Sequence, residues 1–540
     1  MPSQAQSRTL TAATFSFFAA FLLIGLLVFR DYGISWDEFP TRRFGIMYVE
    51  HLVPDAHALD SLRAASGPSY ERFGPVFEIL LVRAEKLMQP TDIRTVFFTR
   101  HLATFLTFFL GVVLFHRLCR RRFRSGIALL ACVCLVVSPQ LFSHAFYNVK
   151  DIAFLTMFVA SMLTLDTMLG CPEWRTMLVH ALTTAVLLGT RVLGLFAMLL
   201  TAAASIARRP TLRTLGLLLG YSVVIGLLLP VVWPVLQIDF LRIVSDAVLG
   251  TTSNPYLSAN LFRGRAISAS ALPWDYVPTW ILITTPLIVS ALFVVGVGSA
   301  VAKLARHPRD FFDHEPQRDL VVLCWFFLPV FGSVVLRPIM YDGWRHLFFV
   351  YPALVYLAAV GMETIATYAT AHVGEARKQV VVTVLTVALL LCLAPVVAFM
   401  ARNHPFEHVY FNRLAGRDMK EIKQRFELDY WGLSYRKALE YIVRSDSAPR
   451  IRIFTTTYPG RVNVAMLPQR DRERLDFVHS DAEADYVMTN YRFHPQDYPY
   501  SREVFSVRVG NASIASVFVV RGQSMTSPSP MPSPAGDRPR

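Results

Sequence analysis

The sequence predicts a mainly α-helical, polytopic membrane protein with about 11 transmembrane helices and a small C-terminal α/β soluble domain. Three observations predict this fold class. Apolar residues make up 54% of the 540 residues and charged residues only 17%, whereas soluble domains carry roughly 25% charged residues. Up to position 400, the apolar residues gather in runs close to the ~20 residues that a membrane-spanning helix needs. Beyond position 400 the apolar runs are short, as in strands and amphipathic helices.

Eleven apolar runs are the predicted membrane helices. The first run has no small-residue cleavage site at its end, which indicates a retained span rather than a signal peptide. Gly189 and Arg191 interrupt the stretch 177–207, which the sequence allows to be two short spans or one kinked span. The predicted spans are 12–29, 97–117, 126–143, 152–170, 177–190, 192–207, 213–236, 279–302, 320–337, 347–364 and 379–400.

Basic residues in short loops predict the orientation. They cluster at 117–124, 208–213, 303–318 and 377–378. With eleven spans all four clusters fall on one side, which the positive-inside rule places in the cytoplasm. We therefore expect an integral protein of a bacterial inner membrane, with a cytoplasmic N-terminus and a periplasmic C-terminal domain. The net charge of +14 then needs no nucleic-acid partner.

The chain is expected to divide into three regions. Residues 1–400 form a transmembrane domain whose first external loop is 30–95, residues 401–522 form the α/β domain, and the Ser/Pro-rich residues 523–540 are disordered. The six cysteines lie in or beside apolar runs, so no disulfide framework is expected. Within the α/β domain the pattern predicts a helix over 434–444, strands over 451–455 and 485–489, and a hairpin of 503–509 with 514–520.

The distribution of polar residues indicates where chemistry takes place. The predicted spans hold almost no Asp, Glu, Lys or His, and the exceptions lie near span ends. A transporter usually places such groups near the midplane of the bilayer. We therefore expect chemistry at the outer face, and a transporter or flippase of lipid-linked sugars is the alternative.

The first external loop opens with Trp36, Asp37 and Glu38. A carboxylate beside an apolar surface has a raised pKa, which suits proton abstraction from a hydroxyl. The alternative is an interfacial tryptophan anchor followed by solvated acids.

Two further polar elements lie between predicted spans. Asn148, Lys150 and Asp151 are consistent either with a capped helix start or with a lipid phosphate held by Lys150. Arg191 is costly in a membrane without an anion. Its partner must be a distant acid, such as Asp37 or Asp151, or a bound phosphate.

The loop before the tenth span combines Tyr341, Asp342, Trp344, Arg345 and His346. An interfacial loop with a snorkelling arginine would explain its aromatic residues and Arg345. It would not explain so many hydrogen-bonding side chains in six residues, which favours a binding site.

In this order these elements resemble the GT-C superfamily of polytopic membrane glycosyltransferases. The similarity is to the branch of protein O-mannosyltransferases and bacterial aminoarabinose transferase, and it covers about residues 12–432, including a tail segment from His404 to Trp431. Two departures are a Val at position 149, where relatives often carry Pro, and the lack of the long insert of eukaryotic O-mannosyltransferases.

The resemblance implies an inverting glycosyltransferase of hexosyl or pentosyl type with a GT-C fold. Its donor is a polyprenyl-phosphate sugar, its acceptor a lipid, polysaccharide or protein, and it is surrounded by membrane lipids. Asp37 is implied as general base, with Glu38 orienting it or the acceptor. The implied donor phosphate-binding residues are Lys150, Arg191, Arg345 and His346. The implied substrate-binding residues are Trp36, Asn148, Asp151, Tyr341, Asp342 and Trp344.

No cofactor and no metal ligand are predicted. The chain lacks an Asp-x-Asp element, a GxxxxGK[ST] loop and a GxGxxG loop after a strand. Related O-mannosyl enzymes need no metal, whereas more distant GT-C members do. A divalent metal is therefore not expected, although the sequence leaves it open.

Overall fold

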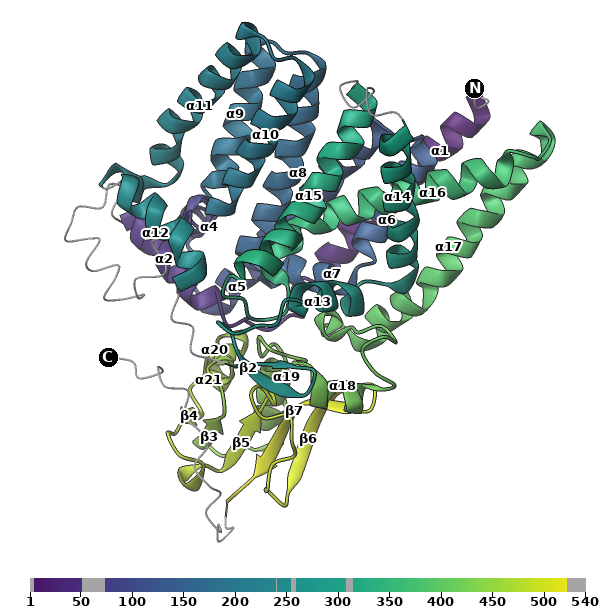
Figure 1. The fold of residues 1–540 in the computed structure, drawn as a ribbon. Helices are drawn as coiled ribbons and strands as arrows, with labels where there is room; N and C mark the ends of the chain where they lie inside the picture. Colours follow the sequence, from purple (N-terminus) through teal and green to yellow (C-terminus); the bar gives the residue numbers. More distant parts are fainter. Residues whose placement is uncertain (1–3, 51–72, 239, 254–258, 307–313, 522–540) are drawn as a thin grey trace.

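The computed structural model describes residues 4–50, 73–238, 240–253, 259–306 and 314–521. A helical bundle occupies most of the chain, and a C-terminal α/β domain lies against one end of it (Figure 1). We call this end of the bundle the domain face and the other end the opposite face. Part of the predicted first loop, 51–72, and the predicted disordered tail lie outside the described residues. The coarse fold class, mainly helical with a small C-terminal sheet, is confirmed.

The bundle is built from helices of very different lengths. The helices are α1 (Gln4–Val28), α2 (Glu38–Glu50), α4 (Val76–Met88), α5 (Ile93–Arg120), α6 (Ser125–Val136), α7 (Pro139–Tyr147), α8 (Val149–Gly170), α9 (Trp174–Leu188), α10 (Leu195–Arg208), α11 (Leu212–Val232), α12 (Phe240–Ser253), α13 (Tyr276–Thr284), α14 (Leu287–Arg306), α15 (His314–Leu336), α16 (Tyr351–Thr370) and α17 (Glu375–Asn403). A short antiparallel ribbon, β1 (Ala259–Phe262) with β2 (Arg265–Ser268), lies at the domain face.

The predicted count of about 11 membrane helices is not confirmed. In the described chain eight helices are long and apolar enough to cross a membrane, or nine if the bent pair α6 and α7 is one span. The stretch 177–207 forms two separate helices, α9 and α10, of 15 and 14 residues. Helices α6 and α7 meet at 67°, where Pro139 begins α7. An apolar window in the sequence does not detect such bends.

The predicted span 279–302 is also broken. Thr285 has an extended backbone (φ −88°, ψ 137°), as is usual for a residue before proline, and Pro286 follows it. Helix α13 therefore ends at the domain face, and only α14 is long enough to span.

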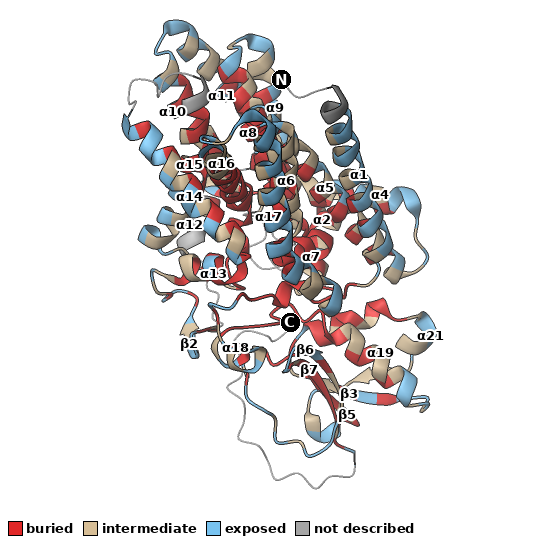
Figure 2. Ribbon diagram, turned by 90° about the vertical axis from the view of Figure 1, so that its right-hand side faces the viewer, coloured by how far each residue is buried: buried red, intermediate tan, exposed pale blue. Residues whose placement is uncertain are grey.

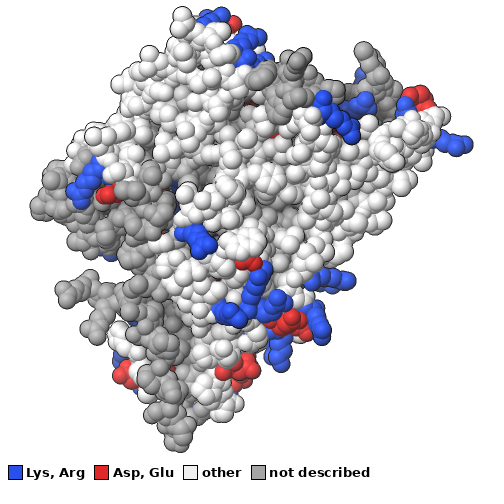
Figure 3. Space-filling model, viewed as in Figure 1, with Lys and Arg blue, Asp and Glu red and all other residues white. Residues whose placement is uncertain are grey.

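Burial separates the helices into core and perimeter. In α8 and α16 about five sixths of the apolar window is buried (83%), whereas in α17 only 17% is buried, and Figure 2 shows this contrast. Exposed leucines and valines on the outer helices are expected to meet lipid. On the face drawn in Figure 3, charged side chains gather toward the two ends of the bundle and on the α/β domain, and the surface between is largely uncharged.

The C-terminal domain is a five-stranded mixed sheet in the order β4-β3-β5-β7-β6. Strands β4 and β5 run parallel to β3, while β5–β7 and β7–β6 are antiparallel. The predicted helix, strands and hairpin of this domain are confirmed. Its elements are α18 (Met419–Arg425), α19 (Tyr435–Ser445), β3 (Ile451–Thr455), α20 (Pro459–Val462), α21 (Gln469–Arg472), β4 (Leu475–Phe477), β5 (Tyr486–Thr489), β6 (Glu503–Val509) and β7 (Ala512–Val519).

This domain holds the start of the first loop through backbone hydrogen bonds. The side chain of Asn463 accepts from the Ile34 backbone N–H (2.8 Å) and donates to the Ile34 carbonyl (2.9 Å). Arg436 of α19 donates to the carbonyl of Tyr32 (2.8 Å). The segment that leads to Asp37 is therefore fixed between the bundle and the sheet domain.

Candidate active site

Six of the residues predicted for the site form one cluster of ion pairs at the domain face, which Asp342 joins through Arg345. Asp37 Oδ2 lies 3.4 Å from both Lys150 Nζ and Arg345 Nη2. Asp151 Oδ2 lies 3.3 Å from Arg345 Nη1, and Asp151 Oδ1 pairs with Arg191 Nη2. The fold thus brings together residues from four segments that are far apart in the chain.

The start of α8 places two of these residues. Asn148 caps the helix, because its Oδ1 accepts from the backbone N–H of Asp151 (3.2 Å). Its Nδ2 donates to Asp151 Oδ2 (2.9 Å) and to His144 Nδ1 (2.9 Å). The interpretation of this segment as a capped helix start is confirmed. Because the protein engages both polar atoms of Asn148, a contact of Asn148 with substrate stays a prediction.

Arg191 lies in the break between α9 and α10, where its backbone is extended (φ −154°, ψ 141°). It is buried, and the anion that it requires is Asp151, one of the two acids anticipated from the sequence. Its Nε makes no hydrogen bond within the described chain. Arg191 therefore retains a donor that a bound anion can accept from.

A tight turn places the Arg345 guanidinium beside the carboxylates of Asp37 and Asp151. Asp342 and Gly343 have left-handed backbones (φ 59° and 68°), and Asp342 Oδ2 accepts from Arg345 Nε at 3.3 Å. The guanidinium lies 5.0 Å from the Tyr341 ring centre and 4.8 Å from that of Trp431. These rings fix the plane of a fork of donors suited to a phosphate.

Asp342 is surrounded by donors of the protein itself. Trp431 Nε1 donates to its Oδ2 (2.8 Å), and Arg492 Nη2 donates to its Oδ1 (2.6 Å). Both oxygens are therefore engaged, and a direct contact of Asp342 with substrate stays a prediction.

Asp37 is the most accessible of the three carboxylates. Its side chain is 22% exposed, compared with 2% for Asp151 and 4% for Asp342. Burial alone would raise the pKa of Asp37, but Lys150 and Arg345 outweigh burial and lower the pKa below its ordinary value of 3.8. The expectation of a raised pKa is therefore wrong, because both cations come from segments distant in the sequence.

Glu38 has a different environment from Asp37. Its carboxylate accepts from the backbone N–H of Ser35 (2.6 Å) and pairs with His101 Nε2 of α5 (2.9 Å). It is almost fully buried. These contacts anchor the loop that carries Asp37, and a role of Glu38 toward the acceptor stays a prediction.

The remaining predicted residues line the cluster from two sides. The Trp36 ring lies 4.8 Å from the guanidinium of Arg492. Trp344 is buried and donates to the Thr284 hydroxyl (2.9 Å), which makes it part of the packing beneath the loop. His346 lies against Tyr341 (ring centres 4.9 Å apart), and its Nδ1 makes no hydrogen bond within the described chain.

Sequence reasoning missed Arg492, although it touches the centre of the site. It follows β5 in a turn where Tyr491 and Phe493 both have left-handed backbones (φ 59° and 64°). An arginine between two aromatic residues at a strand end is the only trace of this role in the sequence. Its ion pair with Asp342 depends on how the sheet domain packs on the bundle.

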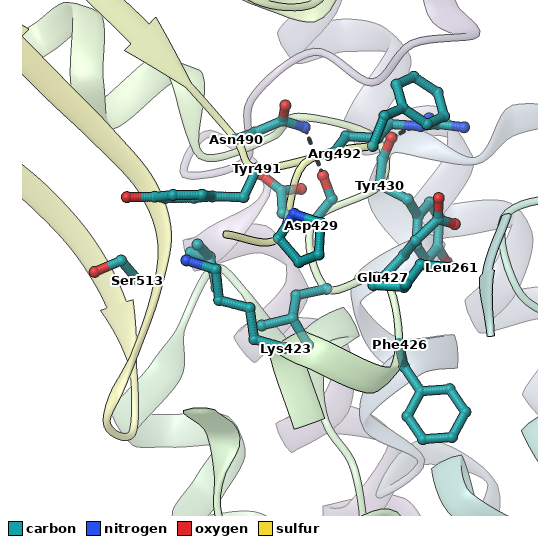
Figure 4. A pocket seen from close by; sticks show the side chains of 14 residues that line it. Leu261, Lys423, Phe426, Glu427, Asp429, Tyr430, Asn490, Tyr491, Arg492 and Ser513 are labelled. Carbon is teal, nitrogen blue, oxygen red and sulfur yellow. Dashed lines mark hydrogen bonds between the residues drawn. The ribbon is translucent and has the colours of Figure 1, made fainter. Parts of the chain in front are cut away.

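A small cavity adjoins the cluster on the side of the α/β domain (Figure 4). Its volume of about 20 Å³ suits a water molecule. Glu427 lines it and is buried. Burial raises the pKa of Glu427 from 4.5 to about 7, with Arg492 opposing the shift and Asp342 adding to it.

Among the residues that the structure describes, no group of three or more His, Cys, Asp or Glu side chains is placed to hold a metal ion.

Comparison with known proteins yields similar structures but no similar sequences. No protein-family model matches the chain, and no curated protein matches it. The chain is similar to ArnT from Cupriavidus metallidurans in the apo state (12% identity, TM-score 0.49, covering 94% of this chain and 98% of that one). ArnT bound to undecaprenyl phosphate gives 13% identity and a TM-score of 0.48 over 96% of this chain and 99% of that one.

A second similar structure is the Archaeoglobus fulgidus oligosaccharyltransferase in its apo form. It is 11% identical with a TM-score of 0.45, over 87% of this chain and 65% of that one. Because the identities and scores are low, the function proposed below is argued from the residues of this chain.

Proposed function

We propose that this protein is an inverting glycosyltransferase that moves a sugar from a polyprenyl-phosphate donor to an acceptor at the outer face of the membrane. One observation carries the proposal. At the domain face, the described cluster holds four cations (Lys150, Arg191, Arg345 and Arg492) against three carboxylates (Asp37, Asp151 and Asp342).

An extra buried cation is costly unless an anion accompanies it. A lipid-linked phosphate supplies that anion at the depth of a helix end. Arg191 Nε and Arg345 Nη2 are buried donors that make no hydrogen bond within the described chain. In the proposed complex they bind phosphate oxygens, and Lys150 lies beside them in the first turn of α8.

The proposed reaction uses these cations when the donor breaks. The acceptor oxygen or nitrogen attacks the anomeric carbon, and the bond from that carbon to the phosphate oxygen breaks. Its electron pair stays on the lipid phosphate, which gains negative charge. Cations preorganised around that oxygen stabilise the transition state, and removing one such donor typically lowers turnover about 10²–10³-fold.

Asp37 is the proposed base that takes the acceptor proton. It is the most exposed carboxylate of the cluster, and its lowered pKa keeps it ionised throughout the neutral range. Because a carboxylate of low pKa is a weak base, we expect the proton to move late, after the new bond to the sugar has begun to form.

We further propose that the reaction needs no metal, since the side-chain cations supply the positive charge. The alternative function, a transporter or flippase of lipid-linked sugars, needs no base. It predicts that Asp37→Asn leaves donor binding and transport intact.

The test follows turnover of polyprenyl-phosphate hexoses and pentoses by purified protein in nanodiscs, with and without EDTA. The matched control for Asp37→Asn is Asp275→Asn, since Asp275 is an 18%-exposed acid at the same face that pairs with Arg263 (2.7 Å). We expect Asp37→Asn to abolish turnover while the control and EDTA leave it intact. Turnover that survives in Asp37→Asn would exclude Asp37 as base, and unchanged transport without turnover would favour the flippase.

A further inference from the structure

The α/β domain inserts one side chain into the cluster, that of Arg492. Its Nη2 donates to Asp342 Oδ1 at 2.6 Å, and its Nη1 donates to the carbonyl of Tyr430. The guanidinium also lies 4.8 Å from the ring centre of Trp36. Only 3% of the side chain is exposed, so Arg492 is an internal component of the domain interface.

The backbone on both sides of this ion pair adopts conformations that non-glycine residues rarely take. Tyr491 and Phe493 flank Arg492 with φ of 59° and 64°, and Asp342 itself has φ of 59°. Such conformations persist only where surrounding contacts determine them, and they are concentrated at functional sites. Here they turn Arg492 and Asp342 toward each other.

The two carboxylate oxygens of Asp342 contact different partners. Oδ1 accepts from Arg492, whereas Oδ2 lies 3.2 Å from Arg345 Nη2 and 2.8 Å from Trp431 Nε1. Holding one oxygen fixes the rotation of the carboxylate, which determines where the other oxygen meets Arg345. Arg492 thus contacts the Arg345 loop through Asp342 and the Asp37 loop through Trp36.

We propose that Arg492 is a positioning residue through which the α/β domain holds Arg345 and the Asp37 loop in the geometry that binds the donor phosphate. This inference rests on the proposed function for the identity of the reaction. It assigns to the α/β domain a direct part in forming the site, beyond covering it. Arg492 itself is not assigned a contact with substrate.

The test distinguishes a role of Arg492 in positioning Arg345 and the Asp37 loop from a role in merely attaching the α/β domain to the bundle. Arg472 of α21 provides the matched control, since it also joins the α/β domain to the bundle, through Asp92 at the start of α5 (2.7 Å). The probe is undecaprenyl phosphate, titrated into wild type, Arg492→Gln, Asp342→Asn, the double variant and Arg472→Gln, with thermal unfolding recorded for each.

We expect Arg492→Gln to weaken binding of undecaprenyl phosphate at least tenfold, with Arg472→Gln within twofold of wild type. Because Arg492 reaches Arg345 through Asp342, the loss of affinity in the double variant should be smaller than the product of the two single losses, and the contact with Trp36 accounts for what Arg492→Gln loses beyond Asp342→Asn. Arg492→Lys, which keeps the charge but not the fork, should recover part of the affinity. Equal losses in Arg492→Gln and Arg472→Gln, or losses that multiply in the double variant, would overturn the proposal.

This cycle does not depend on turnover. If wild type transfers no sugar from any donor, the proposed function fails, while the binding cycle still supports or overturns the role of Arg492. If turnover is observed, but wild type, Arg492→Gln, Asp342→Asn and the double variant bind undecaprenyl phosphate equally well, the proposed function stands and the positioning role of Arg492 fails.

Discussion

Two buried ion clusters lie at opposite ends of the same bundle, and they are built differently. At the opposite face Asp166 pairs with Arg121 at 2.7 Å and with Arg318 at 2.6 Å. Beside them, Arg122 pairs with Glu363 at 2.8 Å and with Asp319 at 3.4 Å. Three cations thus meet three carboxylates among the described residues. At the domain face, four cations meet three carboxylates, and the contacts of Asp37 are 3.4 Å long.

The two clusters differ in their balance of charge. The opposite-face cluster has equal numbers of cations and carboxylates, and it joins the end of α5 to α8, α15 and α16. The domain-face cluster has one cation more than it has carboxylates, and the proposed donor phosphate would balance it. Burial and ion pairing are common to both clusters, so the extra cation is what distinguishes the cluster at which we propose a donor site.

The largest expected effect comes from removing one arginine at each face. Arg345→Gln should lower turnover about 10²–10³-fold, by analogy with loss of an oxyanion donor. Arg318→Gln should leave turnover per folded molecule unchanged but destabilise the protein by about 2 kcal/mol, since it removes one of the two arginines that hold the buried carboxylate of Asp166. Steady-state rates and thermal unfolding of the two variants measure this. A large loss of turnover in Arg318→Gln would break the distinction between the clusters.

A buried carboxylate outside both clusters gives the next effect. The pKa of Glu427 is raised by burial from 4.5 to about 7. Between these pH values the unfolded chain is ionised and the folded chain protonated, so stability falls as pH rises through this window. Glu427→Gln removes the cost of ionising a buried carboxylate. We therefore expect the variant to have the same free energy of unfolding as wild type at pH 4.5, and a free energy of unfolding about 3 kcal/mol higher than wild type at pH 8.

The control for Glu427 is Glu440 of α19. Burial would raise its pKa, but Arg436 and Lys437 lower it. Glu440→Gln should therefore destabilise at neutral pH, with a difference that disappears as pH falls through the lowered pKa. Denaturant unfolding of both variants across pH measures the two effects, which have opposite signs. A Glu427→Gln protein less stable than wild type at pH 8 would contradict the raised pKa of Glu427.

The smallest effect sharpens the charge comparison itself. At one hundred times its dissociation constant, undecaprenyl phosphate should stabilise wild type by about 2.7 kcal/mol. Lys150→Gln leaves three cations against three carboxylates at the domain face, so its stabilisation at the same ligand concentration should be much smaller. Lys378→Gln, which removes an exposed cation at the opposite face paired with Glu375, should retain the full shift. Equal shifts in all three proteins would show that the extra cation is not what recruits the phosphate.

Local sequence patterns predicted local structure well. The alternation in 503–520 predicted the β6–β7 hairpin, and apolar runs located nearly every long helix. The patterns failed where a bend depends on a proline within an apolar run, as at Pro139 and Pro286. The apolar count is the same with or without the bend.

For the site, the sequence identified polar elements that the fold then brought together. It could not show that Lys150 and Arg345 would surround Asp37, so the expected direction of its pKa was wrong. Arg492 was missed because its contacts with Asp342, 150 positions earlier, and with Trp36 join segments that are far apart in the chain. Such a contact depends on packing between domains and leaves no local pattern.

The clamp of Asn463 on Ile34 also sets an order of events during biosynthesis. The two residues are 429 positions apart, and at 5–20 residues per second a ribosome needs roughly 20–90 s to pass from one to the other. The loop bearing Asp37 is therefore translated well before the domain that fixes it. A growing chain therefore has its membrane helices before it has the α/β domain that completes the proposed site.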